Sequence, residues 1–144
     1  MKLRQAAALD AAELVQLESA QSLCAHWGEK GWREEIVQPA SIVWCAEVEG
    51  KVVGFAAMRV AADYGEILNV AVHPDYCRQG IAFRLLSKLL SQAREQECKQ
   101  VTLEVNIRNR PAISLYTKIG FAEVGRRDKF YNAQEDALVM GITL

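Results

Sequence analysis

Residues 69–83 read Asn-Val-Ala-Val-His-Pro-Asp-Tyr-Cys-Arg-Gln-Gly-Ile-Ala-Phe, and this stretch predicts a strand that a short loop joins to a long helix. The strand covers residues 65–72 and stops at His73-Pro74-Asp75. The helix begins at Gly80 and continues to about residue 97 without a proline. Its apolar positions follow helical spacing: Ile81, Leu85, Leu86, Leu89 and Leu90. A strand joined in this way to an amphipathic helix indicates an α/β fold.

The rest of the chain continues the same mixture of strands and helices. Before this stretch, the pattern predicts a strand at residues 3–6, a helix capped by Asp10, a short helix at residues 29–37, and a hairpin of residues 42–48 and 51–60 around Glu49-Gly50. After it come a strand at residues 101–106, a helix that Asn109 caps and Gly120 ends, and strands at residues 121–131 and 137–144. We therefore expect residues 1–144 to form one domain, with a mixed sheet of about seven strands flanked by about four helices.

The composition is that of an ordinary globular protein, and it argues against several classes of function. The chain has 144 residues, of which 51% are hydrophobic and 24% charged. Its formal net charge of -1 argues against direct nucleic-acid binding. No segment has the length of a membrane span or the pattern of a signal peptide, so we expect a cytoplasmic protein that binds no membrane.

The cysteines and histidines show no disulfide framework and no metal-site spacing. The cysteines are far apart in the sequence: Cys24, Cys45, Cys77 and Cys98. Neither His26 nor His73 stands at ligand spacing from a cysteine, so we expect reduced thiols and no bound metal. An acyl-cysteine route is also disfavoured, because no histidine lies beside Cys77 in the sequence to activate it.

The start of the long helix has the features of a phosphate-binding segment. A helix N-terminus presents free N–H groups and the positive end of the helix dipole to an anion such as a pyrophosphate. Gly80 and Ala82 have little bulk, so the backbone can approach phosphate oxygens, and Arg78 adds positive charge. The spacing is not that of a Walker A loop. Taken alone, a glycine at such a position is more often a requirement of the turn.

This segment resembles the coenzyme A loop of the GNAT superfamily of acetyltransferases, which has the pattern Q/R-x-x-G-x-G/A. Gly80 and Ala82 fall in its register, whereas Cys77 stands where the family has glutamine or arginine. The resemblance implies a GNAT fold and acetyl-CoA as the acetyl donor. It implies that the pantetheine arm bonds to the backbone of Val70, Ala71 and Val72. It also implies a set of residues around the pyrophosphate: Arg78, Gln79, Gly80, Ile81, Ala82 and Phe83.

Residues 103–121 read LEVNIRNRPAISLYTKIGF and resemble the signature L-E-V-x-x-x-N-x-x-A-x-x-L-Y-x-x-x-G-F of the RimI family within GNAT. Members of that family acetylate the N-terminal alanine of a small-subunit ribosomal protein. Residues 27–30, 126–131 and 135–137 agree with the same family, so the resemblance spans almost the whole chain. It implies that the acceptor is a protein N-terminus, with a small-subunit ribosomal protein as the partner.

Glu104 and Tyr116 are the candidate base and acid in this signature. Glu104 lies on the polar face of its predicted strand, where it can take a proton from an amine directly or through a water. By resemblance, the Tyr116 hydroxyl protonates the leaving sulfur, and Asn109, two helical turns before it, bonds the coenzyme arm. A phenol suits the acid role because its reference pKa is about 10. We expect the carboxylate and the phenol to converge on the sulfur end of one ligand, while a backbone N–H near Val70 polarises the carbonyl.

The chemistry of the acceptor favours an N-terminal amine. An α-amino group has a reference pKa near 8 and lysine one near 10.4, so roughly a tenth of the former but well under a thousandth of the latter is neutral at pH 7. By resemblance, Trp27 and Tyr131 flank the peptide entrance. Glu66 is a candidate acidic lining for a basic target peptide, although a lone surface carboxylate is more often simply solvated. Without the resemblance, Trp27 is equally well a packing anchor and Tyr131 a strand aromatic.

Two other functions remain open at this stage. The same acid and base would serve a GNAT enzyme that acetylates a lysine or a small-molecule amine. A non-catalytic module that senses acyl-CoA is the second alternative, although the presence of both Glu104 and Tyr116 speaks against it.

Overall fold

The computed structural model describes residues 1–20, 26–131 and 135–144, with the backbone alone for residues 127–131 and 135. The strands are β1 (Lys2–Gln5), β2 (Ser41–Val48), β3 (Lys51–Ala61), β4 (Tyr64–Val72), β5 (Gln100–Asn106), β6 (Ala122–Tyr131) and β7 (Glu135–Thr143). The helices are α1 (Ala11–Ser19), α2 (Gly28–Val37), α3 (Ile81–Glu95) and α4 (Arg110–Ile119), with 3-10 turns at Ala8–Asp10 and Pro74–Tyr76. The predicted order of elements is confirmed.

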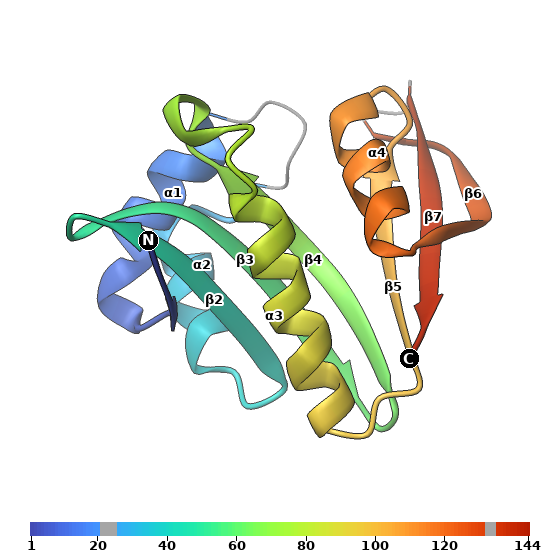
Figure 1. Cartoon of the computed structure of the whole chain (residues 1–144), viewed down its shortest axis with the longest axis horizontal. Coiled ribbons are helices and arrows are strands. Elements are labelled where there is room, and N and C mark those ends of the chain that lie inside the picture. Colours follow the sequence, from blue (N-terminus) through green and yellow to red (C-terminus); the bar gives the residue numbers. More distant parts are fainter. Residues whose placement is uncertain (21–25, 132–134) are drawn as a thin grey trace.

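The strands form one mixed sheet with helices on both faces (Figure 1). The strand order is β1-β2-β3-β4-β5-β7-β6, and every neighbouring pair is antiparallel except β4 and β5. Helices α3 and α4 pack on one face, whereas α1 and α2 pack on the other. We call these the α3/α4 face and the α1/α2 face. None of the described helices is long and apolar enough to cross a membrane.

Each face of the sheet has its own apolar core, because successive side chains of a strand point to opposite faces. The larger core, on the α3/α4 face, includes Leu85, Leu86 and Leu89 of α3, each 0% exposed. The smaller core, on the α1/α2 face, contains Trp32 of α2 and Phe55 of β3, also 0% exposed. The alternation predicted from the sequence thus decides which side chains meet α3 and which meet α2.

The β2–β3 turn and both ends of α4 lie at the residues that the sequence predicted. Glu49 and Gly50 both have positive φ, 51° and 79°, as a two-residue hairpin turn requires. The Asn109 side chain accepts a hydrogen bond from the Ala112 N–H at 3.3 Å and so caps α4. Gly120 ends that helix at φ 125°.

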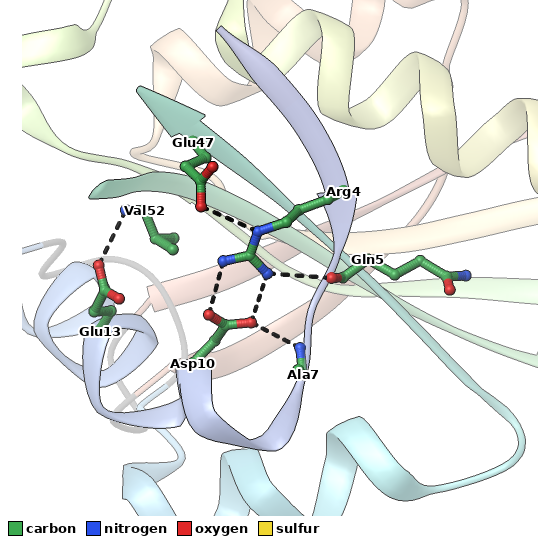
Figure 2. A network of polar contacts seen from close by, with 7 residues as sticks. All are labelled: Arg4, Gln5, Ala7, Asp10, Glu13, Glu47 and Val52. Carbon is green, nitrogen blue, oxygen red and sulfur yellow. Dashed lines mark hydrogen bonds and ion pairs between the residues drawn. The ribbon is translucent and has the colours of Figure 1, made fainter. Parts of the chain in front are cut away.

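Asp10 acts differently from the predicted helix cap (Figure 2). It stands at the N-cap position of α1, but its side chain makes no capping hydrogen bond to that helix. Its carboxylate instead accepts two bonds from the Arg4 guanidinium, at 2.8 and 2.9 Å, and one from the Ala7 N–H at 2.7 Å. Arg4 also bonds Glu47 at 3.2 Å. A bidentate charged partner is stronger than a neutral N–H donor, so the carboxylate ties β1 to the start of α1.

We expect the hydrogen bonds of Asp10 to stabilise the folded protein less in acid than at neutral pH. Hydrogen bonding from Arg4 holds the pKa of Asp10 below its usual value, despite the opposing effect of burial. A lowered folded-state pKa stabilises the protein above the unfolded value of about 4, and that stability is lost as the pH falls through the folded-state pKa. We expect Asp10→Asn to cost about 1–3 kcal/mol at pH 7. Urea unfolding at pH 7 and pH 3 measures this. An equal cost of the substitution at both pH values would contradict it.

Candidate active site

The sheet opens between its two parallel strands. β4 and β5 pair only from Tyr64↔Gln100 to Ile67↔Leu103, and the two strands diverge beyond that point (Figure 1). The opening coincides with a β-bulge: Met58 of β3 pairs with Ile67, but its neighbour Ala57 pairs with Asn69, which leaves Leu68 as an extra residue in β4. A bulge bends its strand and disrupts the ladder, so it gives a physical cause for the divergence. We call the region beyond Ile67 and Leu103, where β4 and β5 no longer pair with each other, the open seam.

The bulge also decides how β4 presents its side chains at the open seam. Val70 and Val72 belong to the core on the α3/α4 face, whereas Ala71 belongs to the core on the α1/α2 face. Backbone groups on the β5 side of this stretch make no β-ladder bonds to β5. A strand edge that does not continue its ladder can accept an extended, amide-containing ligand.

The start of α3 has a backbone shaped for an anion. Arg78 and Gly80 have positive φ, 64° and 79°, while Gln79 between them does not. Alternating backbone conformations of this kind turn successive N–H groups toward one concave side. Gly80 is the N-cap residue, and no side chain caps α3 there. The first N–H groups of α3, which begins at Ile81, are therefore not occupied by a capping side chain.

The predicted phosphate-binding residues divide into those that offer side chains and those that offer only backbone. The Ile81 side chain is 4% exposed and belongs to the core, so this residue can offer a ligand only its backbone. Arg78 and Gln79 are exposed. A Cβ atom built on Gly80 would have no other atom within 4 Å, so open space lies beside it. Ala82 is half-buried, and Phe83 is 39% exposed with Lys118 Nζ of α4 5.8 Å from its ring centre.

Glu104 and Tyr116 come from opposite faces of the sheet. Leu103 and Val105 point into the core beneath α3 and α4, so Glu104 between them points to the α1/α2 face. Tyr116 is 8% exposed in the core of the α3/α4 face, with its ring 5.8 Å from that of Phe121. A base and an acid so placed share no groove on one face. They can reach the same ligand only across the open seam.

Asn109 already has a structural role at the start of α4. The cap bond from Ala112 uses one lone pair of its side-chain oxygen, which leaves the second lone pair and the NH2 group for a coenzyme arm. Asn109 is half-buried.

The side chains predicted to contact the acceptor substrate, as far as the structure describes them, lie on the α1/α2 face. Trp27 is half-buried at the N-cap position of α2 and packs against the core there. Glu66 is exposed and pairs across β3 with Arg59, whose guanidinium is bonded to Glu35 at 2.6 and 2.9 Å. Glu66 therefore lies next to a cation rather than in a purely acidic lining. The backbone of Tyr131 lies in β6, and its side chain is outside the described part of the structure.

Two of the described cysteines are buried and one is exposed. Cys45 is buried, which raises the pKa of its thiol to about 12, and burial raises that of Cys98 as well. Cys77 is exposed, and its thiol lies 3.6 Å from the His73 carbonyl oxygen. Cys24 lies outside the described residues. In the part of the chain that the structure describes, no three potential ligand side chains are grouped around a metal position.

The sequence reasoning missed buried polar residues on the α1/α2 face, among them Glu18 and Asn69. Glu18 is 1% exposed and Asn69 is 5% exposed. A signal for Glu18 was available, because it lies four residues after Leu14 and seven after Ala11, on the buried stripe of α1. No local signal marked Asn69, since the bulge at Leu68 decides which face it occupies.

A sequence match to a known protein family covers most of the candidate site. Residues 10–121 match the sequence model of the Acetyltransferase (GNAT) family. The chain belongs to this family. The predicted GNAT fold is confirmed, and the protein is an N-acetyltransferase of GNAT type, a fold that uses acetyl-CoA.

This GNAT chain is similar to acetyltransferases known from sequence and from solved structures. It is 36% identical over 98 residues to the ribosomal protein bS18-alanine N-acetyltransferase of Escherichia coli strain K12, a match that covers 66% of each chain. The crystal structure of the ribosomal-protein-S18-alanine N-acetyltransferase from Escherichia coli has a TM-score of 0.90, 27% identity, and coverage of 99% of this chain and 92% of that one. The crystal structure of a Bacillus anthracis protein named as a putative streptothricin acetyltransferase, in complex with acetyl coenzyme A, has a TM-score of 0.71 and 25% identity, and the match covers 78% of this chain and 68% of that one.

Proposed function

We propose that this GNAT protein transfers an acetyl group from acetyl-CoA to the N-terminal α-amino group of a ribosomal protein, with alanine as the acceptor residue. The observation that carries the proposal is the open seam, with a carboxylate on one face and a phenol on the other. A thioester that lies in the seam is accessible to an amine from the Glu104 side and to a proton donor from the Tyr116 side.

The donor substrate fits the residues at the start of α3 and along β4. The positive φ angles of Arg78 and Gly80, and the uncapped N–H groups that follow, suit a pyrophosphate. The unpaired edge of β4 around Val70 suits the amides of a pantetheine arm. Acetyl-CoA supplies an activated acetyl group, and every other part of the chemistry falls to the side chains and backbone of this protein.

In the proposed mechanism, Glu104 accepts one proton and Tyr116 donates one. Glu104 takes a proton from the attacking amine, directly or through a water, as the nitrogen bonds to the acetyl carbon. The carbon–sulfur bond breaks, and the Tyr116 hydroxyl gives its proton to the leaving thiolate. A backbone N–H near Val70 stabilises the charge that develops on the carbonyl oxygen. Glu104 then releases its proton to solvent and Tyr116 regains one from solvent, so both groups return to their starting states.

The choice of acceptor rests on the similar proteins and on amine chemistry. The Escherichia coli relative and the solved neighbour are both named for acetylation of a ribosomal-protein alanine. An α-amino group also has a larger neutral fraction at pH 7 than a lysine has, so it demands less of a base. Both arguments favour an N-terminus over a lysine or a small amine.

The proposal is tested with two peptides and acetyl-CoA. One peptide has a free N-terminal alanine and no lysine, and the other has a blocked N-terminus and one internal lysine. We expect mass spectrometry to place one acetyl group on the first peptide and none on the second. Acetylation of the lysine peptide alone would overturn the choice of acceptor. A series of N-terminal sequences, with that of the ribosomal protein included, then tests the partner.

A further inference from the structure

Glu18 is a buried carboxylate that none of the roles above uses. It lies near the end of α1 on the same stripe as Leu14, and it is 1% exposed. A charged group removed from water destabilises a protein strongly unless donors surround it, and an apolar residue would fill the same position without that cost. The presence of a carboxylate here therefore suggests that its hydrogen bonds hold something in place.

Three donors to Glu18 come from the N-cap residue and the first half of α2. The Trp27 N–H donates to Oε2 at 3.0 Å, and the Gly28 N–H donates to Oε1 at 2.9 Å. The Trp32 indole N–H donates to Oε2 at 2.8 Å. The first two donors are backbone groups that α2 itself cannot satisfy, and Trp27 offers no side-chain cap. Glu18 thus caps α2 from another helix and grips Trp32 with the same carboxylate.

These bonds hold a row of three aromatic rings that leads toward the open seam. The Trp27 and Trp32 ring centres are 4.5 Å apart, and those of Trp32 and Phe55 are 4.7 Å apart. Phe55, at the other end of the row, pairs with Ala71 of β4, which lies beyond the last pair between β4 and β5 and so borders the open seam. The row lies on the α1/α2 face, which is also the face toward which Glu104 points.

We propose that Glu18 is a positioning residue for the acceptor substrate. By fixing the Trp27 backbone and the Trp32 indole, it holds the Trp27 ring as one wall of the site through which an N-terminal peptide reaches Glu104. This inference rests on the proposed function, because it assumes a peptide acceptor on the α1/α2 face. The pyrophosphate and pantetheine positions involve α3 and β4, so removal of the Glu18 charge affects the acceptor and leaves acetyl-CoA recognition unchanged.

The positioning role of Glu18 is tested by steady-state kinetics of the Glu18→Gln variant with the alanine peptide. Glutamine keeps the size of the side chain but replaces an acceptor oxygen with an NH2 group, which cannot accept the N–H bonds. We expect the peptide KM to rise about tenfold, a typical cost for the loss of an ordered aromatic contact. The KM for acetyl-CoA and kcat at saturating peptide are expected to stay within about twofold. Glu13→Gln is the matched control, because Glu13 lies in the same helix and accepts the Val52 N–H at 3.0 Å, away from the tryptophans.

A double-mutant cycle separates positioning from general stability. Trp27→Ala leaves the buried carboxylate in place and is expected to raise the peptide KM at least as much as Glu18→Gln. The double variant should then be no worse than Trp27→Ala alone, since Glu18 acts through that ring. If Glu18→Gln does not fold, Trp32→Phe removes one donor and keeps a ring, with an expected rise of about threefold.

Three results would overturn the inference. The first is an unchanged peptide KM in Glu18→Gln. If Glu18→Gln does not fold, an unchanged peptide KM in Trp32→Phe has the same meaning. The second is an unchanged peptide KM in Trp27→Ala. The third is a parallel rise in the KM for both substrates, which would indicate only a structural role for Glu18. A wild-type protein that does not acetylate the alanine peptide would instead overturn the proposed function, and this inference with it.

Discussion

Tyr116→Phe is expected to lower kcat by ~10²-fold or more, in line with the contribution of a general acid. Phenylalanine keeps the buried ring and its contact with Phe121, so the fold and the α3/α4 core are preserved. The change removes only the hydroxyl, and the thiolate then leaves without a proton from the protein. We expect the acetyl-CoA dissociation constant, measured by calorimetry, to change by less than about threefold, because the proton transfer belongs to the transition state.

Tyr64→Phe is the matched control for this result. Tyr64 donates a hydrogen bond to Thr102 at 2.9 Å at the paired end of β4 and β5, away from the open seam. Its loss is expected to leave kcat unchanged. A Tyr116→Phe variant with wild-type turnover would remove this residue from the mechanism, and a water or the solvent would then have to protonate the sulfur.

Gly80→Leu is expected to raise the KM for acetyl-CoA by about ten- to hundredfold. The new side chain would enter the open space beside the N-cap of α3, where we place the pyrophosphate. Loss of one charge-assisted hydrogen bond from the N–H groups costs about 1.5–3 kcal/mol, which corresponds to that range of affinity. The positive φ of 79° adds about 1–2 kcal/mol of backbone strain to the folded state.

Gly50→Leu separates the strain from the loss of binding. Gly50 has the same φ of 79°, and a Cβ there would also have no other atom within 4 Å, but it lies in the β2–β3 turn. We expect both variants to lose similar unfolding free energy in urea, with a raised KM for acetyl-CoA only in Gly80→Leu. Equal KM values in the two variants would place the pyrophosphate elsewhere.

Much of the fold was predictable because it depends on short-range patterns. The apolar spacing from Ile81 to Leu90 marks α3, and the alternation along residues 101–106 marks β5. The cap at Asn109 and the glycine at position 120 mark the ends of α4. Each of these signals acts within a few residues, so it is visible in the sequence without knowledge of the neighbours.

The relation between the candidate base and acid could not be predicted in the same way. Glu104 and Tyr116 are twelve residues apart in one signature, yet they occupy opposite faces of the sheet. Only strand pairing reveals that the seam between β4 and β5 connects those faces. Asp10 illustrates the same limit, because its carboxylate pairs with Arg4 rather than with the helix that follows it.

The sequence by itself determined the order of elements, the polar and apolar faces of each, and the motifs typical of a GNAT enzyme. The tertiary structure alone decided where β4 leaves β5, which face Asn69 occupies, and what the buried Glu18 holds. The reason is physical: periodicity and capping are set by neighbours along the chain. A bulge, the end of a ladder and the partners of a buried charge depend on contacts between distant segments, where several pairings compete.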